Sequence, residues 1–255
     1  MQSTPISATL TLVILLQTSL PSRAQVLDGQ NATFGFQTDF ASRYVSRGLG
    51  FTQGPVEQSR VWMTISNLTI YGWTNLVVAE EPQQGEINEV DFGIAYMREW
   101  KGLTWEPAAD CYWYPKPRNL SIPKTPPTGE VSLKASHPVG LASLFAKYAA
   151  DIGSYRGSYF GEVGVSSEQK WSSRLTSASS ARLGWASAKF AGAYTDGTAR
   201  SFSIIGLDVS LTYALGRQIY IRPHFEWTVA PGTPSLPMIG SAGVAFGFDP
   251  SIGTR

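Results

Sequence analysis

Extended segments with a period-two pattern recur along this chain from residue 33 to residue 248. Every second side chain in them is apolar, which is typical of β-strands with one apolar face. The connections alternate strictly: a long polar one, such as Ala79–Asn88, follows each odd-numbered segment, and a tight turn, such as Trp100–Gly102, follows each even-numbered one. An up-and-down barrel has this property, because one rim carries tight turns and the other long loops.

We count about twelve such segments, or ten if the weakly patterned third and seventh (Ile70–Val78 and Leu141–Ala150) are not strands. Strict alternation requires an even number of strands and places both ends of the barrel at one rim. A soluble β-sandwich with Greek-key connections has no reason to alternate in this way. The predicted fold class is therefore all-β, a closed antiparallel transmembrane β-barrel.

The last segment, Ser241–Phe248 (SAGVAFGF), is expected to close this barrel. Its apolar face ends on the aromatic Phe248, near the end of the chain. Its inward face carries only Gly243, Ala245 and Gly247, which leaves lumen space beside the charged strand before it. Barrel-assembly machinery reads an aromatic residue near the end of the last strand, so we expect this machinery to be a partner of the closing strand.

The N-terminal residues are typical of a cleaved signal peptide. The apolar run Leu10–Leu16 is too short to span a bilayer, which takes about 20 residues, and small residues at Ser22 and Ala24 mark a cleavage site. We expect a signal peptide (1–24), a short periplasmic segment (25–32), an outer-membrane barrel (33–248) and a C-terminal tail (249–255). Only helices and closed barrels can span a membrane, and no later stretch is long and apolar enough for a helix. The expected location is therefore the outer membrane of a Gram-negative bacterium.

Composition agrees with a surface that faces lipid. Charged residues make up 15% of the chain and aromatic residues 12%, whereas water-soluble domains carry about 25% charged residues. The formal net charge of +1 gives no basis for a nucleic-acid partner. Cys111 is the single cysteine, so a fold stapled by internal disulfides is excluded. We expect Cys111 to be a small apolar side chain on a strand.

Charged side chains fall on the face of the segments that would line the lumen. The predicted pore-lining residues are Asp39, Arg43, Arg60, Asp91, Glu106, Asp110, Lys134, Glu162, Arg182, Asp208, Arg222, His224 and Glu226. With Glu89 and Glu130 added and the histidine left aside, acids outnumber bases nine to five. In a water-filled lumen that balance would mildly favour cations.

His224 lies between Arg222 and Glu226 on the polar face of one segment, with about 7 Å between alternate residues. Two interpretations are open for this row of charges. It is either a polar constriction that selects solutes, or an ion-pair ladder in which buried polar groups satisfy one another.

Ser136 and His137 raise the hypothesis of an outer-membrane lipid hydrolase, because such enzymes use a serine activated by a histidine. Neighbouring residues of a strand point to opposite faces, so these two cannot pair, and we predict no catalytic residue. No cofactor or metal site is predicted, since no two His or Cys residues stand at ligand spacing. The glycines at Gly48–Gly54 predict a flexible extracellular loop and no phosphate site, because no helix follows them.

The chain resembles the TorF family of bacterial porin-like barrels. The resemblance rests on Phe40–Gln58 (FASRYVSRGLGFTQGPVEQ), Thr69–Val78 (TIYGWTNLVV), Ile87–Lys116 (INEVDFGIAYMREWKGLTWEPAADCYWYPK) and, loosely, Gly129–Ser136 (GEVSLKAS). It covers the first half of the mature chain best. The resemblance implies an outer-membrane barrel with a pore function, and it supplies no catalytic residues.

The leading hypothesis is a porin-like channel that passes small polar solutes by diffusion through a charged lumen. The alternatives are a non-conducting structural or adhesive barrel that acts through its extracellular loops, especially 115–129, and an outer-membrane lipid hydrolase. The expected partners are outer-membrane lipids and small polar solutes, with no nucleic acid.

Overall fold

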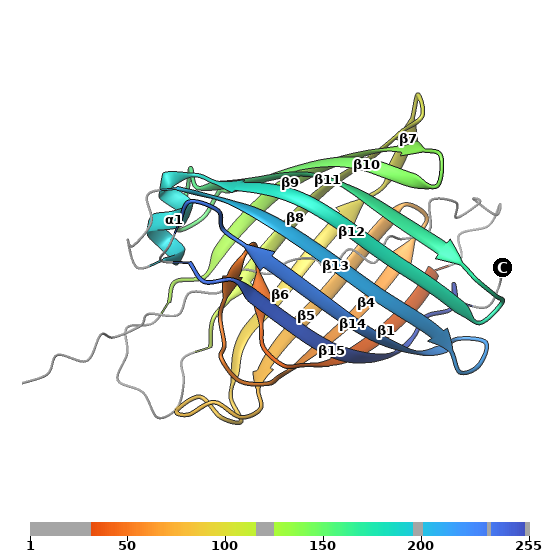
Figure 1. Ribbon diagram of the computed structural model, residues 1–255, viewed down its shortest axis with the longest axis horizontal. Coiled ribbons are helices and arrows are strands. Elements are labelled where there is room, and N and C mark those ends of the chain that lie inside the picture. The colour runs from red at the N-terminus through yellow and green to blue at the C-terminus, as the bar shows by residue number, and fades with distance from the viewer. Residues whose placement is uncertain (1–31, 116–124, 196–200, 234–235, 253–255) are drawn as a thin grey trace, which may run out of the picture.

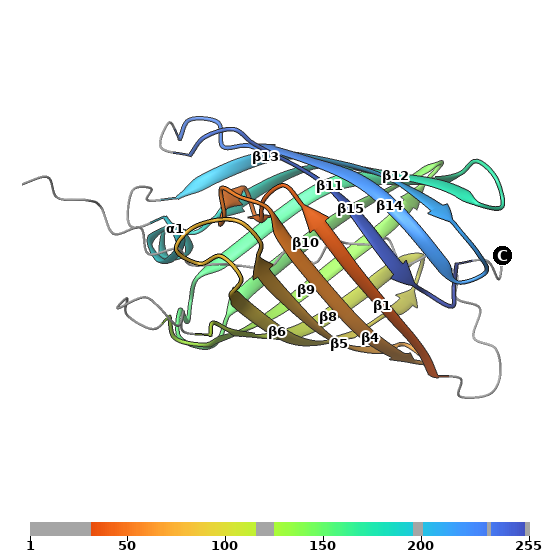
Figure 2. The same cartoon turned by 90° about the horizontal axis from the view of Figure 1, so that it is seen from below.

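The computed structural model describes residues 32–115, 125–195, 201–233 and 236–252. The expected signal peptide and the centre of the Pro-rich connection at 115–129 lie outside these residues. Twelve long strands form one closed antiparallel barrel (Figures 1 and 2). They are β1 (Ala32–Ala41), β4 (Val56–Ile65), β5 (Leu68–Val77), β6 (Ile87–Tyr96), β8 (Leu103–Trp113), β9 (Thr128–Val139), β10 (Ala142–Asp151), β11 (Tyr159–Lys170), β12 (Leu175–Ala186), β13 (Phe202–Ala214), β14 (Ile219–Val229) and β15 (Ile239–Phe248).

The predicted count of twelve strands and the closing role of the last strand are confirmed. β15 pairs with β1 in a register that runs from Phe36 opposite Phe248 to Ala41 opposite Gly243. β6 pairs with both β5 and β8, so the ring has no open edge. The weakly patterned third and seventh segments are the full-length strands β5 and β10.

The connections alternate between long and short as predicted. Tight turns join the strands at the rim near the C-terminus, and the longer connections lie at the opposite rim (Figure 1). Lys101 and Gly102 both have positive φ, 53° and 75°, as a type I′ hairpin turn requires. The short strand β7 (Arg98–Trp100) extends this hairpin by pairing with the start of β8.

The outer face of the barrel is apolar and exposed. Its side chains include Phe34, Phe92, Leu144, Leu183, Leu207 and Phe225, each more than two-fifths exposed. In an isolated barrel in water such a surface would be a large unfavourable apolar patch. It explains why the chain combines few charges with many aromatic residues.

The main buried apolar cluster lies at the rim of long connections. It joins the first long connection, the helix α1 (Ala188–Tyr194) and the adjoining strand ends, through Tyr44, Leu49, Phe51, Tyr112, Phe160, Phe190, Ala191, Phe202 and Ile204. Figure 1 shows α1 at this end of the barrel. We call residues 44–52 together with α1 the mouth plug.

The expectation of a flexible loop at Gly48–Gly54 is wrong. This connection contains a small hairpin of β2 (Val45–Ser46) and β3 (Leu49–Gly50), and most of its side chains are buried. Gly48 has a φ of 80°, and a Cβ there would lie 2.5 Å from Ile204 Cγ2. The glycine is therefore needed for a left-handed turn packed closely against β13.

The helix α1 was not expected, because only extended segments and their connections were predicted between residues 33 and 248. Ser187 caps the helix by accepting a hydrogen bond from the Phe190 N–H at 3.1 Å. Seven residues are too few to show a helical repeat, and burial of Phe190 and Tyr194 in the plug stabilises what propensity alone would not. No helix among the described residues is long and apolar enough to cross a membrane.

Candidate functional site

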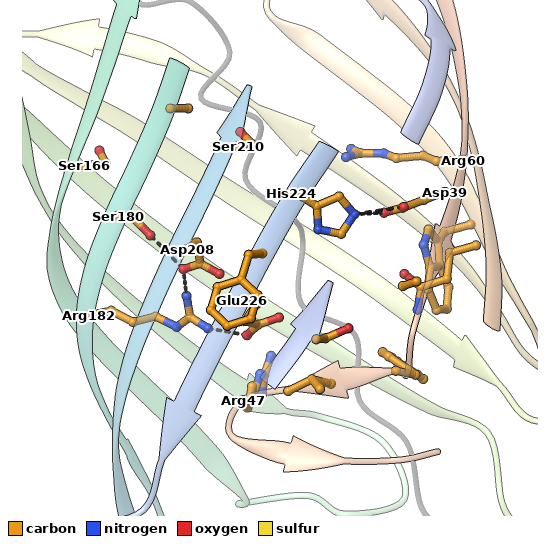
Figure 3. Close-up of a pocket in the computed structure, with 18 of the residues that line it drawn as sticks. Asp39, Arg47, Arg60, Ser166, Ser180, Arg182, Asp208, Ser210, His224 and Glu226 are labelled. Carbon is orange, nitrogen blue, oxygen red and sulfur yellow. Dashed lines mark hydrogen bonds and ion pairs between the residues drawn. The ribbon is translucent and has the colours of Figure 1, made fainter. Parts of the chain in front are cut away.

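The candidate site is a cavity of about 180 Å³ inside the barrel. Each of the twelve long strands contributes at least one side chain to its wall. Most of these side chains are polar or charged, and Figure 3 shows several of them. A space of this size holds several water molecules, since one needs only about 10–15 Å³ on the same measure. The centre of the barrel is thus lined mainly by polar side chains, and the main buried apolar cluster lies at the rim, around the mouth plug.

Twelve of the thirteen predicted pore-lining residues line this cavity, and Glu106 does not. Two basic residues were missed. Lys147 lies on β10, whose alternation is weak, and Arg47 lies in the first long connection. Lys147 lies directly opposite Glu162 in the register of β10 and β11, which the weak alternation of β10 does not reveal.

The charge balance of the cavity differs from the sequence-based expectation. Its described lining carries seven carboxylates and seven Lys or Arg side chains, so the predicted excess of acids is wrong for this compartment. The part that these residues play in solute passage stays a prediction.

Arg182 gathers three carboxylates on one wall. Its Nη2 lies 2.6 Å from Glu226 Oε1, its Nε lies 3.8 Å from Glu162 Oε2, and its Nη1 pairs with Asp208 (Figure 3). The side chain reaches two strands away because it crosses Gly206, where a Cβ would lie 2.9 Å from its Cζ. One guanidinium among three carboxylates leaves this wall acidic.

Side chains of β14 cross the closing strand to reach β1. His224 Nε2 lies 2.9 Å from Asp39 Oδ1. Farther along the strand, the Tyr220 hydroxyl donates to Gln37 Oε1 at 2.8 Å. The crossing is possible because β15 turns only small residues inward; a Cβ on Gly243 would lie 2.5 Å from His224 Nε2.

The predicted row of Arg222, His224 and Glu226 does face the cavity, but its members bond to other strands. His224 pairs with Asp39 on β1, and Glu226 pairs with Arg182 on β12. The ladder along one strand is therefore replaced by a network around the barrel wall. Partners on different strands fix the neighbouring side chains more rigidly than a single row could.

A buried ion pair holds the mouth plug to the barrel wall. Arg47 makes a two-pronged contact with Glu130 of β9, with Nη2–Oε1 and Nη1–Oε2 distances of 2.6 and 2.9 Å. Its guanidinium also lies 5.1 Å from the ring centre of Phe160 and 5.7 Å from that of Phe190. Burial alone would lower the pKa of Arg47, but the Glu130 carboxylate outweighs it, so the pKa is raised and the arginine is charged.

The two histidines do not form a catalytic pair with serine in this geometry. His137 is exposed near the turn rim, and its Nδ1 lies 2.8 Å from the carbonyl oxygen of Gly102. His224 is engaged with Asp39. Cys111 is exposed, as its place on the outward face of β8 requires.

No protein-family model and no curated protein sequence matches this chain. Among solved structures it is similar to the KdgM porin (TM-score 0.53, 10% identity) and to the NanC porin (TM-score 0.53, 13% identity). Each of these comparisons covers 84% of this chain and 98% of the other. The fold is that of an outer-membrane β-barrel. The COG4313 outer-membrane channel from Pseudomonas putida F1 is similar at a TM-score of 0.50 and 8% identity, over 90% of this chain and 98% of that one.

Proposed function

We propose that this protein is an outer-membrane channel through which small polar solutes diffuse. The observation that carries the proposal is the charged cavity, to which all twelve strands contribute. A barrel with a purely structural role can fill its interior with apolar side chains, whereas buried charges cost free energy unless they are paired or hydrated. The structurally similar KdgM and NanC proteins are named as porins, which agrees with this function.

The exposed apolar face of the strands supports a location in the lipid of the outer membrane. The signal peptide at 1–24, the contact of assembly machinery with the strand ending at Phe248, and membership in the TorF family belong to the same proposal. They rest on the sequence patterns described above.

In this proposal the protein carries out no chemical step. The barrel wall excludes large solutes, and the lumenal charges set the free energy of each small ion or solute along the path. The mouth plug fills the outer end of the lumen and sets the size limit there. Residues on different strands, such as Arg182 and Asp39, act by their charge and by their position in the wall.

Liposome swelling tests this function. Vesicles that contain the purified protein should swell in small neutral and charged solutes at rates that fall steeply with solute size. Vesicles with heat-denatured protein provide the control. Swelling no faster than in the control for every solute, including the smallest, would contradict the proposal.

One observation favours a second candidate, a non-conducting barrel that acts through its outer loops. The side chains of the apolar cluster pack against one another across the outer rim of the barrel. If this cluster is permanent, removing it should create a conductance that the intact protein lacks. The channel function instead requires a conductance in the intact protein.

A further inference from the structure

Two arginines flank Gln37 of β1 on one wall of the cavity. Arg60 of β4 is the direct cross-strand partner of Gln37, which places the two Cβ atoms about 5 Å apart. Arg222 of β14 reaches the same glutamine from the other side and donates from Nη2 to Gln37 Oε1. Both guanidinium groups line the cavity.

Neither of these two positive charges forms a close ion pair among the described residues. In the part of the chain that the structure describes, the ion pairs within 4.0 Å involve Arg47, Arg182 and His224, and neither Arg60 nor Arg222. Arg222 bonds to a neutral amide, and the buried Nε of Arg60 has no hydrogen-bond acceptor. Two neighbouring carboxylates make their close contacts elsewhere: Asp39 with His224, and Asp110 with the Tyr71 hydroxyl. Asp110 and Glu106 attract Arg60 only from beyond ion-pair distance.

Aromatic rings hold Arg60 in place without neutralising it. Its Cζ lies 4.8 Å from the ring centre of Tyr71 and 5.8 Å from that of Trp62. A guanidinium that stacks by its face keeps its N–H edge free for a planar acceptor. A buried charge without a close counter-ion is costly, and a bound anion reduces this cost.

We infer that Arg60 and Arg222 form an anion-binding subsite for small solutes that carry a carboxylate. A carboxylate accepts two parallel N–H bonds from one guanidinium and is attracted by the second. Around Arg182 three carboxylates face one guanidinium, which disfavours anions at that part of the wall, so the two arginines mark where along the lumen an anion binds. The inference deepens the proposed channel function and names its substrate class.

Bromide locates the subsite independently of conductance. Crystals of the full-length protein soaked in sodium bromide should show an anomalous peak between the Arg60 and Arg222 guanidinium groups. Arg60→Gln should remove the peak. Arg174→Gln is the matched control and should keep the peak, because Arg174 is exposed in a turn and does not line the cavity. A wild-type crystal without this peak would overturn the subsite.

Malonate tests the solute class in planar bilayers. It should reduce the chloride current of the wild-type protein, and the apparent affinity should fall about tenfold in Arg60→Gln and in Arg222→Gln, which is the loss expected for one charge-assisted hydrogen bond. Arg60→Lys keeps the charge and should show a smaller loss. A difference in gel migration between unheated and heated samples verifies that each variant folds. Equal affinity in all folded variants would contradict the inference.

The two experiments separate the subsite from the channel. A bromide peak in a protein that does not conduct would leave the subsite standing and remove the proposed function. Conductance without a bromide peak and without malonate block would support the proposed function and overturn the subsite.

Discussion

Gly243 shows how one residue on the closing strand controls contacts between its two neighbours. The His224 side chain passes over it to reach Asp39, and no room remains for a Cβ. The Phe40 carbonyl oxygen would also lie 2.9 Å from that Cβ, so the clash cannot be relieved by the histidine alone. The missing side chain is thus part of the lumenal network.

Gly243→Ala should therefore displace His224 and lower the free energy of unfolding by about 1–3 kcal/mol, the usual cost of overpacking. Gly216→Ala is the matched control, because a Cβ there meets nothing within 4 Å. Urea unfolding in lipid vesicles, followed by tryptophan fluorescence, measures both. Equal stability of the two variants would show that β15 does not need a small residue at this position.

A second prediction for single residues concerns the Arg47–Glu130 ion pair, which should hold the mouth plug in place. Removing one member leaves a buried charge without its partner, which costs about 3–5 kcal/mol, whereas replacing both by apolar residues can be neutral. Glu130→Leu should expose the mouth plug to chymotrypsin at Tyr44 and Phe51. The double variant Arg47→Met/Glu130→Leu should restore resistance. If the single variant is as resistant as the wild-type protein, the pair does not hold the plug.

The period-two pattern of each strand predicted which residues face inward, but it could not predict their partners. Partners depend on strand register and on how far a side chain leans over a neighbouring glycine, as Arg182 does over Gly206. Neither is encoded in the alternation of one strand. Arg47 was missed for a related reason, because it enters the lumen from a connection and not from a strand.

At the scale of elements, the strands could be predicted and the mouth plug could not. Each long strand repeats its pattern over ten or more residues, as the weakest of them, β10, still does in the structure. The helix α1 has seven residues and the β2–β3 hairpin has two residues per strand. Both depend on mutual burial of distant apolar residues, which no local pattern reveals.

Replacing residues 44–52 by a Gly/Ser segment of the same length should raise the single-channel conductance. The replacement removes the Arg47 anchor, and it removes Leu49 and Phe51 from the apolar cluster at the rim. The same replacement of the exposed residues Pro82–Gly85 is the control and should leave the conductance unchanged. Equal conductance in both variants would mean that the plug does not limit passage.

At the scale of the whole molecule, the barrel turns the usual distribution of side chains inside out. Apolar residues cover the outside, and charges line the central cavity. The alternation of long and short connections was sufficient to predict this architecture, because closure, even strand number and rim assignment follow from it together. The cavity's charge balance was predicted less well, since Glu89 and Glu106 do not line the cavity, whereas Arg47 and Lys147 do.

The apolar outer face predicts that the free energy cost of a charged substitution depends on how deep in the membrane it lies. Leu207→Arg, in the middle of β13, should lower the free energy of unfolding in lipid by about 2–4 kcal/mol. Leu215→Arg, in the following turn, should cost no more than about 1 kcal/mol. Urea titrations in vesicles compare the two. Equal costs would contradict a membrane that is centred on the middle of the strands.

The central claim, that the charged cavity is part of a conducting path, is tested most directly by single-channel recording. Purified wild-type protein in a planar bilayer with potassium chloride should give discrete conductance steps. Arg60→Gln combined with Arg222→Gln should shift the reversal potential in a salt gradient toward cation selectivity. The absence of conductance steps from folded protein, in the wild type and in the variant with the replaced plug, would contradict the account.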